Sequence, residues 1–205
     1  DVIVALGGGS VIDCAKGISV VIANGGDILD YEGVDAIPLP GPPLICIPTT
    51  AGTAADISQF AIINAVSRRT KVAIISKIVV PDVALVDPQT TVPMSPSLTA
   101  FSGLDALTHA IEAYVSSASS PLSDVHALAA VRSVRANLRQ AVALPDDLQA
   151  REQMMLASLQ AGMAFSNASL GATHAMAHSL GGYLDLAHGE CNALLLPAVV
   201  DFNFH

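Results

Sequence analysis

The chain has 205 residues, of which 52% are hydrophobic and 13% are charged; this composition excludes intrinsic disorder and is typical of a chain that buries a sizeable core. Its net charge of −9 argues against a surface that neutralises nucleic-acid phosphates. Tryptophan is absent and aromatic residues make up only 4%, which predicts a core built from Val, Ile, Leu and Ala.

The first half of the chain alternates between strand-like and helix-like segments. Residues 2–6 are continuously apolar and β-branched, which predicts a strand covered on both faces, and a glycine-rich turn and a helix follow. Further strands are expected at 43–48, at 59–76 as a pair joined by a polar turn at 66–70, and at 82–88. This alternation is typical of an α/β domain.

After about residue 93 the pattern becomes helical. Ser95-Pro96 marks a helix start, and apolar residues recur at helical period through most of the remaining chain. We therefore expect an α/β part at 1–93 and an all-helical part at 94–205.

The turn Gly7-Gly8-Gly9-Ser10 lies between the first strand and the first helix. Such an arrangement directs backbone N–H groups and the positive end of a helix towards a phosphate, and glycine allows a close approach. The spacing is not G-x-G-x-x-G, so phosphate binding and a tight structural turn both stay open.

A carboxylate and an imidazole lie four residues apart in "GLDALTHAIEAY". Asp105 and His109 project from one face of a predicted helix, and Glu112 continues the same stripe. This pair can chelate a divalent metal, or it can form a hydrogen bond on the helix surface.

A second helix repeats the spacing with His174 and His178. We expect this helix to end at Gly181-Gly182 and His188 to lie in the loop beyond. Two helices that both offer ligand-type residues favour a metal site, although a proton relay and ordinary helix histidines stay as alternatives. One Asp with two or three His suits Fe²⁺, Zn²⁺ or a similar ion.

Three unevenly spaced cysteines, Cys14, Cys46 and Cys191, predict thiols in a reducing compartment. No signal peptide or membrane-spanning run is recognisable, so we expect a cytoplasmic protein. The sequence begins inside a strand-like run without Met and ends in an apolar helical run, which leads us to expect an internal fragment of a longer chain.

Four motifs, in the order "GGGSVIDCAK", "PTTAGTAAD", "GLDALTHAIEAY" and "HAMAHSLGGYLDLAHGECNALLLP", resemble the iron-dependent (group III) alcohol dehydrogenases, whose fold is shared with dehydroquinate synthase. The resemblance implies that 1–93 is the C-terminal part of a dinucleotide-binding (Rossmann-like) α/β domain. It implies equally that 94–205 is the N-terminal part of a helical metal-binding domain.

The same resemblance implies hydride transfer between a primary alcohol or small diol and NAD or NADP. It also implies Fe²⁺ or Zn²⁺ as the metal and a small alcohol or aldehyde as the substrate. Apart from the resemblance, we expect a homo-oligomer, specifically a dimer, and neither nucleic acid nor a membrane as a partner. The alternatives are a zinc-dependent polyol dehydrogenase of the same fold and a non-catalytic protein that binds metal and nucleotide.

Residue by residue, the resemblance assigns Asp105, His109, His174 and His188 as metal ligands, and it places His178 beside them, where we expect it to relay a proton. The cofactor-binding positions that it implies are Gly8, Gly9, Ser10, Asp13, Thr49, Thr50, Thr53 and Lys71. Two departures from the family pattern, "AGTAAD" for A-G-T-G-S-E and Ser179 where Pro is usual, affect the expected substrate preference rather than the ligands.

Overall fold

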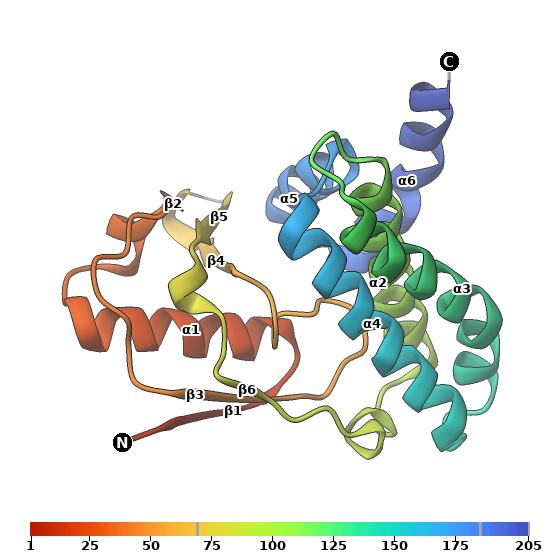
Figure 1. Ribbon diagram of the computed structural model, residues 1–205, viewed down its shortest axis with the longest axis horizontal. Coiled ribbons are helices and arrows are strands. Elements are labelled where there is room, and N and C mark those ends of the chain that lie inside the picture. The colour runs from red at the N-terminus through yellow and green to blue at the C-terminus, as the bar shows by residue number, and fades with distance from the viewer. Residues whose placement is uncertain (69, 185, 205) are drawn as a thin grey trace. The chain divides into compact units, whose positions relative to one another are not determined.

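The computed structural model describes residues 1–68, 70–184 and 186–204 (Figure 1). The chain divides into two compact units, of which the first contains residues 1–49 and 55–87. The second contains the short segment 50–54 and the residues from 88 onwards. The turn predicted at 66–70 includes Arg69, which lies outside the described residues. The functions suggested for 1–93 and 94–205 stay predictions at this point.

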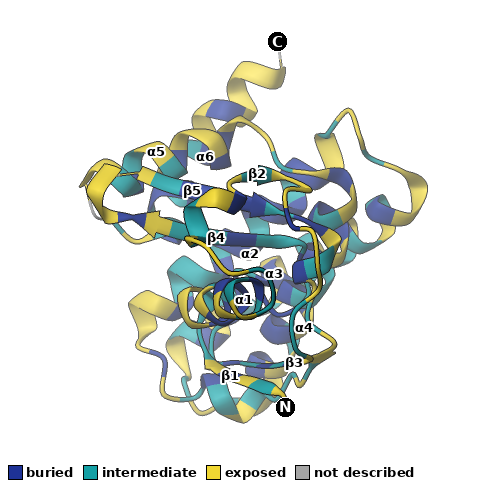
Figure 2. Cartoon of the chain, turned by 90° about the vertical axis from the view of Figure 1, so that its left-hand side faces the viewer, coloured by how far each residue is buried: buried dark blue, intermediate teal, exposed yellow. Residues whose placement is uncertain are grey.

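The first unit is an α/β structure in which helix α1 (Gly9–Asn24) lies between two small sheets (Figures 1 and 2). The sheet with strand order β1-β3-β6 is parallel, and in the sheet with order β2-β5-β4 strand β4 runs antiparallel to β5. The strands are β1 (Ile3–Gly7), β2 (Gly33–Val34), β3 (Leu44–Pro48), β4 (Phe60–Ala65), β5 (Thr70–Ile75) and β6 (Val83–Ala84).

Helix α1 connects the two sheets through different apolar side chains. Ile12 and Ala15 pack with residues of β1 and β3, whereas Val20 packs with residues of β4 and β5. Burying a Val or Ile side chain contributes about 1.5–3 kcal/mol to stability. The contacts of Ile12 and Val20 therefore hold α1 against both sheets. The turn between β1 and α1 is thereby held in place.

Two strand predictions differ from the structure. The first strand was expected to be covered on both faces, but Val4 and Leu6 are 58% and 61% exposed while Ala5 is buried. Because α1 covers one face of β1, the alternate side chains of the strand point away from it. The strand expected at 82–88 is only two residues long, since it pairs with β3 alone and Pro88 begins a 3₁₀ turn.

The second unit is helical throughout its regular structure. Small side chains make up much of its core, as in the cluster of Ala110, Ala130 and Ala161, and they allow α2, α3 and α4 to approach closely. The predicted start at Ser95-Pro96 is confirmed, because the Ser95 side chain caps α2 and Pro96 is its first residue. The helices are α2 (Pro96–Val115), α3 (Pro121–Ala143), α4 (Leu148–Ala168), α5 (Ala172–Leu184) and α6 (His188–Phe204).

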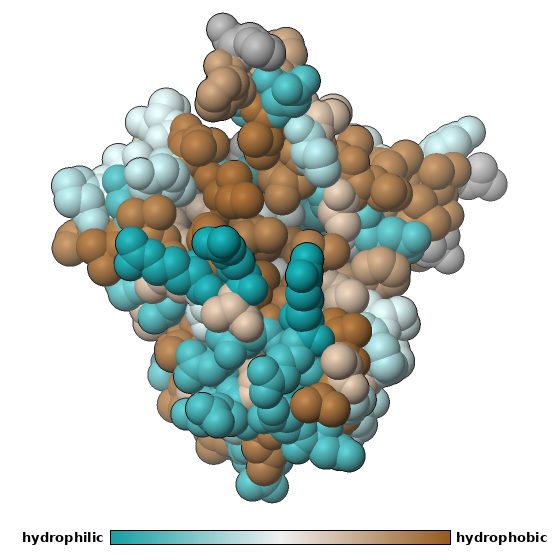
Figure 3. Space-filling view, turned by 90° about the vertical axis from the view of Figure 1, so that its right-hand side faces the viewer, coloured by the Kyte–Doolittle hydropathy of each residue, from teal (hydrophilic) through white to brown (hydrophobic). Residues whose placement is uncertain are grey.

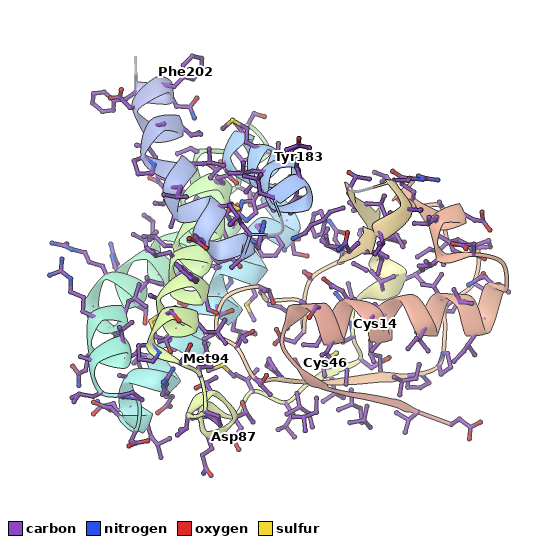
Figure 4. The ribbon with its side chains drawn as sticks, turned by 180° about the vertical axis from the view of Figure 1, so that it is seen from behind. Cys14, Cys46, Asp87, Met94, Tyr183 and Phe202 are labelled. Carbon is purple, nitrogen blue, oxygen red and sulfur yellow. The ribbon has the colours of Figure 1, made fainter. Side chains whose placement is uncertain are left out.

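The expected fold class, an α/β part followed by an all-α part, is confirmed. None of the described helices is both long enough and apolar enough to span a membrane. Exposed apolar side chains, among them Leu194 and Phe202, lie on α6, and the upper part of Figure 3 is largely apolar. Phe202 is labelled near the C-terminal end of α6 in Figure 4.

Candidate metal centre

One carboxylate and three imidazoles converge where α2, α5 and α6 meet. Asp105 Oδ1 lies 3.6 Å from His174 Nε2, 3.7 Å from His188 Nε2 and 3.8 Å from His109 Nδ1. Ligand atoms of Asp105, His109 and His174 all lie within 4.8 Å of one another. Two ligands about 2.1 Å from one ion in a tetrahedral site are roughly 3.4 Å apart, so the separations of Asp105 Oδ1 from His174 Nε2 and His188 Nε2 are close to those of a metal site.

Helix α6 begins with the last of these histidines. His188 was expected in a loop, but it is the first residue of α6, and α5 runs through Gly181-Gly182 to Leu184. Glycine lowers helix stability by only about 1 kcal/mol, which packing of the buried Gly181 can offset. Gly189 lets α6 start directly against α2, because a Cβ there would collide with the carbonyl oxygen of Phe101.

Three of the four proposed ligands are almost fully buried, with Asp105 2%, His174 3% and His109 4% exposed, whereas the side chain of His188 is 23% exposed. Burial alone would raise the pKa of Asp105, but the surrounding histidines, His109 first, hold it well below its usual value. Burial lowers the pKa of His109 to about 4, against the opposing effect of Asp105. Asp105 is therefore ionised and His109 neutral near neutral pH, as metal binding requires.

A second buried carboxylate, Glu112, lies behind His174. Its Oε2 is 2.5 Å from His174 Nδ1, and its Oε1 accepts a hydrogen bond from the Thr173 backbone N–H at 2.7 Å. Burial opposes ionisation of Glu112, but the bond with His174 lowers its pKa to about 2. Burial also opposes protonation of His174, yet Asp105 and Glu112 together raise its pKa to about 9.

The charges of the buried carboxylates and imidazoles indicate whether a divalent metal ion fits this site. Asp105 and Glu112 are two buried carboxylates, and no described lysine or arginine forms an ion pair with either. A buried anion requires a compensating charge. A proton on His174 supplies one positive charge, whereas a divalent cation supplies two and leaves all the imidazoles neutral. The donor set and its charge thus fit a divalent ion.

The imidazole of His109 is held on three sides. Its Nδ1 lies 3.2 Å from the carbonyl oxygen of Gly52, and its ring stacks on Phe165 at 4.4 Å and on His174 at 4.3 Å between centroids. Since a carbonyl only accepts, Nδ1 donates its hydrogen to Gly52 and Nε2 is left as the ligand atom.

Asn192 is part of the same cluster, although the sequence pattern did not predict it. Its Nδ2 donates to Asp105 Oδ1 at 2.7 Å and lies 3.1 Å from His174 Nε2 and 3.3 Å from His188 Nε2. Asn192 is fully buried, and its Oδ1 has no hydrogen-bond partner among the described residues. The four-residue spacing from His188 would have revealed it, had His188 been assigned to a helix.

His178 lies beside the cluster. It is partly buried, whereas Asp105, His109 and His174 are fully buried. Its ring centroid is 4.9 Å from that of His188 and 6.2 Å from that of His174. The structure therefore brings His178 within reach of the proposed ligands while leaving it partly accessible.

The first unit carries the glycine-rich turn that was predicted to bind phosphate. Gly8 precedes α1, Gly9 and Ser10 begin it, and none of the described side chains caps this helix end. The Thr49 backbone N–H donates to the Gly7 carbonyl at 2.9 Å, because β1 and β3 are parallel neighbours. The carboxyl ends of two parallel strands thus lie next to a helix N-terminus, the edge at which ligands bind in open α/β sheets.

Other predicted cofactor residues are divided between the two units. Asp13 and Lys71 lie in the first unit, where burial raises the pKa of Asp13 to about 6 against the opposing charges of Lys16 and Lys71. Thr50 and Thr53 lie in the segment 50–54, which belongs to the helical unit and also contains Gly52.

Comparison with known proteins identifies the family. Residues 1–88 match the family model of iron-containing alcohol dehydrogenases, and residues 99–205 match the model of the C-terminal part of Fe-containing alcohol dehydrogenases. The chain belongs to the iron-containing alcohol dehydrogenase family, which confirms the resemblance found in the sequence.

Three relatives illustrate the similarity. Alcohol dehydrogenase 4 of Schizosaccharomyces pombe is 51% identical over 203 residues, which are 99% of this chain and 48% of that protein. A 1,3-propanediol oxidoreductase structure matches with a TM-score of 0.96 and 47% identity, covering 99% of this chain and 53% of that one. Sulfoacetaldehyde reductase from Bifidobacterium kashiwanohense, solved in complex with NAD⁺, has a TM-score of 0.91 and 35% identity over 98% of this chain and 54% of its own. The chain spans about half the length of these relatives.

Proposed function

We propose that the protein containing this chain is an iron-dependent alcohol dehydrogenase that transfers hydride between a primary alcohol or small diol and NAD. The convergence of Asp105 with three imidazoles in a chain of this family carries the proposal. The propanediol oxidoreductase and the NAD⁺-bound aldehyde reductase among the similar structures support small alcohols or aldehydes as substrates and NAD as the cofactor.

Asp105, His109, His174 and His188 would hold the metal. A divalent ion bound there supplies Lewis-acid chemistry at an alcohol or aldehyde oxygen. The four side chains would hold the ion where bulk water is largely excluded, since three of them are less than 5% exposed. Their mixture of imidazole nitrogen and carboxylate oxygen suits Fe²⁺.

His178 is the proposed proton relay. Imidazole titrates near neutral pH, and the ring lies next to His188 without being one of the proposed ligands. It would take up the hydroxyl proton of an alcohol during oxidation and pass it to solvent.

The β1–α1 turn is the proposed site for the pyrophosphate of NAD. The backbone N–H groups of Gly9 and Ser10 lie at the positive end of α1, and Thr49 is held beside the turn by its bond to Gly7. Gly8, Asp13, Thr50, Thr53 and Lys71 complete the proposed cofactor-binding set.

Cellular location and assembly stay predictions. Cys14, Cys46 and Cys191 form no disulfide within the described residues, and two of them are labelled in Figure 4. This pattern favours the reducing cytoplasm. A homodimer is the expected assembly.

The test uses the intact protein, purified without oxygen and loaded with Fe²⁺. We expect NADH to form with primary alcohols such as 1,3-propanediol, faster than NADPH forms from NADP, and His174→Ala to lose both iron and turnover. Iron-loaded protein that neither oxidises primary alcohols nor reduces the corresponding aldehydes would refute the proposal. Greater activity with Zn²⁺ than with Fe²⁺ would refute the choice of metal.

A further inference from the structure

Glu112 is a buried carboxylate that lies outside the proposed ligand set. It follows Asp105 by seven residues, two turns along the same face of α2, and is only 4% exposed. Such a group costs free energy unless its oxygens are hydrogen-bonded. Its two oxygens have different partners, the ring of His174 and the backbone of Thr173.

The contact with Glu112 gives the two ring nitrogens of His174 different roles. Nδ1 lies 2.5 Å from Oε2, and because a carboxylate only accepts, Nδ1 must carry the hydrogen. Nε2, on the opposite side of the ring, lies 3.6 Å from Asp105 Oδ1, where the proposed ligands converge.

We infer that Glu112 is a positioning residue for the metal centre: it holds the Nδ1–H of His174 so that the Nε2 lone pair is directed at the ion. The inference rests on the metal site of the proposed function. It assigns to Glu112 a role that neither its spacing from Asp105 nor its place on α2 would reveal.

The second oxygen fixes the helix that carries His174. The Thr173 N–H is one of the donors that a helix leaves unpaired at its N-terminus, and Oε1 accepts it. A Cβ on Gly171 would lie only 3.0 Å from the same oxygen, so the turn before α5 also packs closely against Glu112. One carboxylate on α2 therefore sets both the start of α5 and the orientation of the imidazole on it.

Glu112→Gln distinguishes the orientation of His174 from simple packing by the Glu112 side chain, because the amide has the same shape but only one acceptor oxygen. If that oxygen accepts the Thr173 N–H, the amide NH₂ faces His174 Nδ1, and the ring hydrogen moves to Nε2, the atom that should bind the metal. If the amide turns over, its NH₂ opposes the Thr173 N–H instead. Either arrangement penalises metal binding.

The experiment titrates the intact, metal-free protein with Co²⁺, whose visible absorption reports ligand geometry. Removing a partner of this kind typically weakens metal binding, and we expect Glu112→Gln to bind Co²⁺ about 10- to 100-fold more weakly, with a changed spectrum. Glu190→Gln is the matched control, since it removes the same charge in the first turn of α6; we expect its affinity to stay within a factor of about 3. Equal Co²⁺ affinity for Glu112→Gln and the unsubstituted protein would overturn the inference.

A second measurement needs no substitution and so does not depend on the folding of a variant. Long-range nitrogen–proton NMR spectra of histidine-labelled protein, with Zn²⁺ as a diamagnetic probe, report which ring nitrogen carries hydrogen. We expect Nδ1 of His174 to be protonated; Nδ1 bound to the metal would overturn the inference. Neither measurement involves turnover, so a protein that passes both but oxidises no alcohol would refute the proposed function and leave the role of Glu112 intact.

Discussion

Gly52 supplies the carbonyl that orients His109, and it can do so only because it lacks a side chain. An ideal Cβ on Gly52 would lie 2.5 Å from Ser102 O and 2.9 Å from Ser102 Cα, both backbone atoms of α2. Ordinary van der Waals contact begins near 3.4 Å, so Gly52→Ala requires a shift of about 0.9 Å (3.4 − 2.5). That shift exceeds the margin between the 3.2 Å separation of His109 Nδ1 from the Gly52 oxygen and the roughly 3.5 Å limit of a hydrogen bond.

Overpacking of this kind costs about 1–3 kcal/mol, which corresponds to a fall of roughly 2–12 °C in the Tm of a chain of this size. We also expect about tenfold weaker metal binding, because His109 loses the bond that fixes its tautomer. Thermal unfolding of the metal-free protein and Co²⁺ titration measure the two effects.

Gly17→Ala is the control, since it makes the same chemical change inside α1, where the nearest atom to the new Cβ, on Ile28, is 3.4 Å away. This variant should gain about 0.5–1 kcal/mol, because alanine loses less conformational entropy than glycine in a helix. A Gly52→Ala protein that melts at the same temperature as the unsubstituted protein and binds Co²⁺ equally well would contradict this role of Gly52.

Three further substitutions test other parts of the structure. His178→Ala should retain its metal but lose the limb of the pH–rate profile near neutral pH, and an unchanged profile would remove the relay role. Burial raises the folded-state pKa of Asp13 from 3.8 to about 6, so the unsubstituted protein loses stability as the pH rises through this range. Asp13→Asn should therefore become more stable than the unsubstituted protein between about pH 4 and about pH 6, and it should keep this advantage at higher pH. Urea unfolding at about pH 4 and about pH 6 measures the difference in unfolding free energy, and a difference that does not change with pH would contradict the prediction. Ser95→Ala should lower the free energy of unfolding by about 1 kcal/mol, because Ser95 Oγ accepts the Leu98 N–H at 3.2 Å; unchanged urea unfolding would show that this cap contributes nothing.

Local patterns were sufficient for the elements whose ends are set by neighbouring residues. Ser95-Pro96 predicted the start of α2 because a serine cap and a proline at the first position act within one turn. The i,i+4 spacing likewise placed Asp105 and His109 on one face of that helix. The histidine on α6 was assigned to a loop instead, since the start of α6 depends on its close approach to Phe101, a residue far away in the sequence.

Residues that act across helices could not be derived from spacing. Glu112 was visible as part of the α2 stripe, but its contact with His174 joins residues 62 positions apart. Asn192 reaches Asp105 across 87 positions. Exposure along β1 was also mispredicted, because an apolar β-branched run indicates a strand without showing how many of its faces α1 covers.

X-ray absorption at the iron edge of the intact protein, loaded with Fe²⁺ without oxygen, measures the proposed ligand set itself. We expect three imidazole ligands and at least one oxygen around the iron, and the loss of one imidazole in His188→Ala. Sulfur ligands, or a spectrum that His188→Ala leaves unchanged, would contradict it.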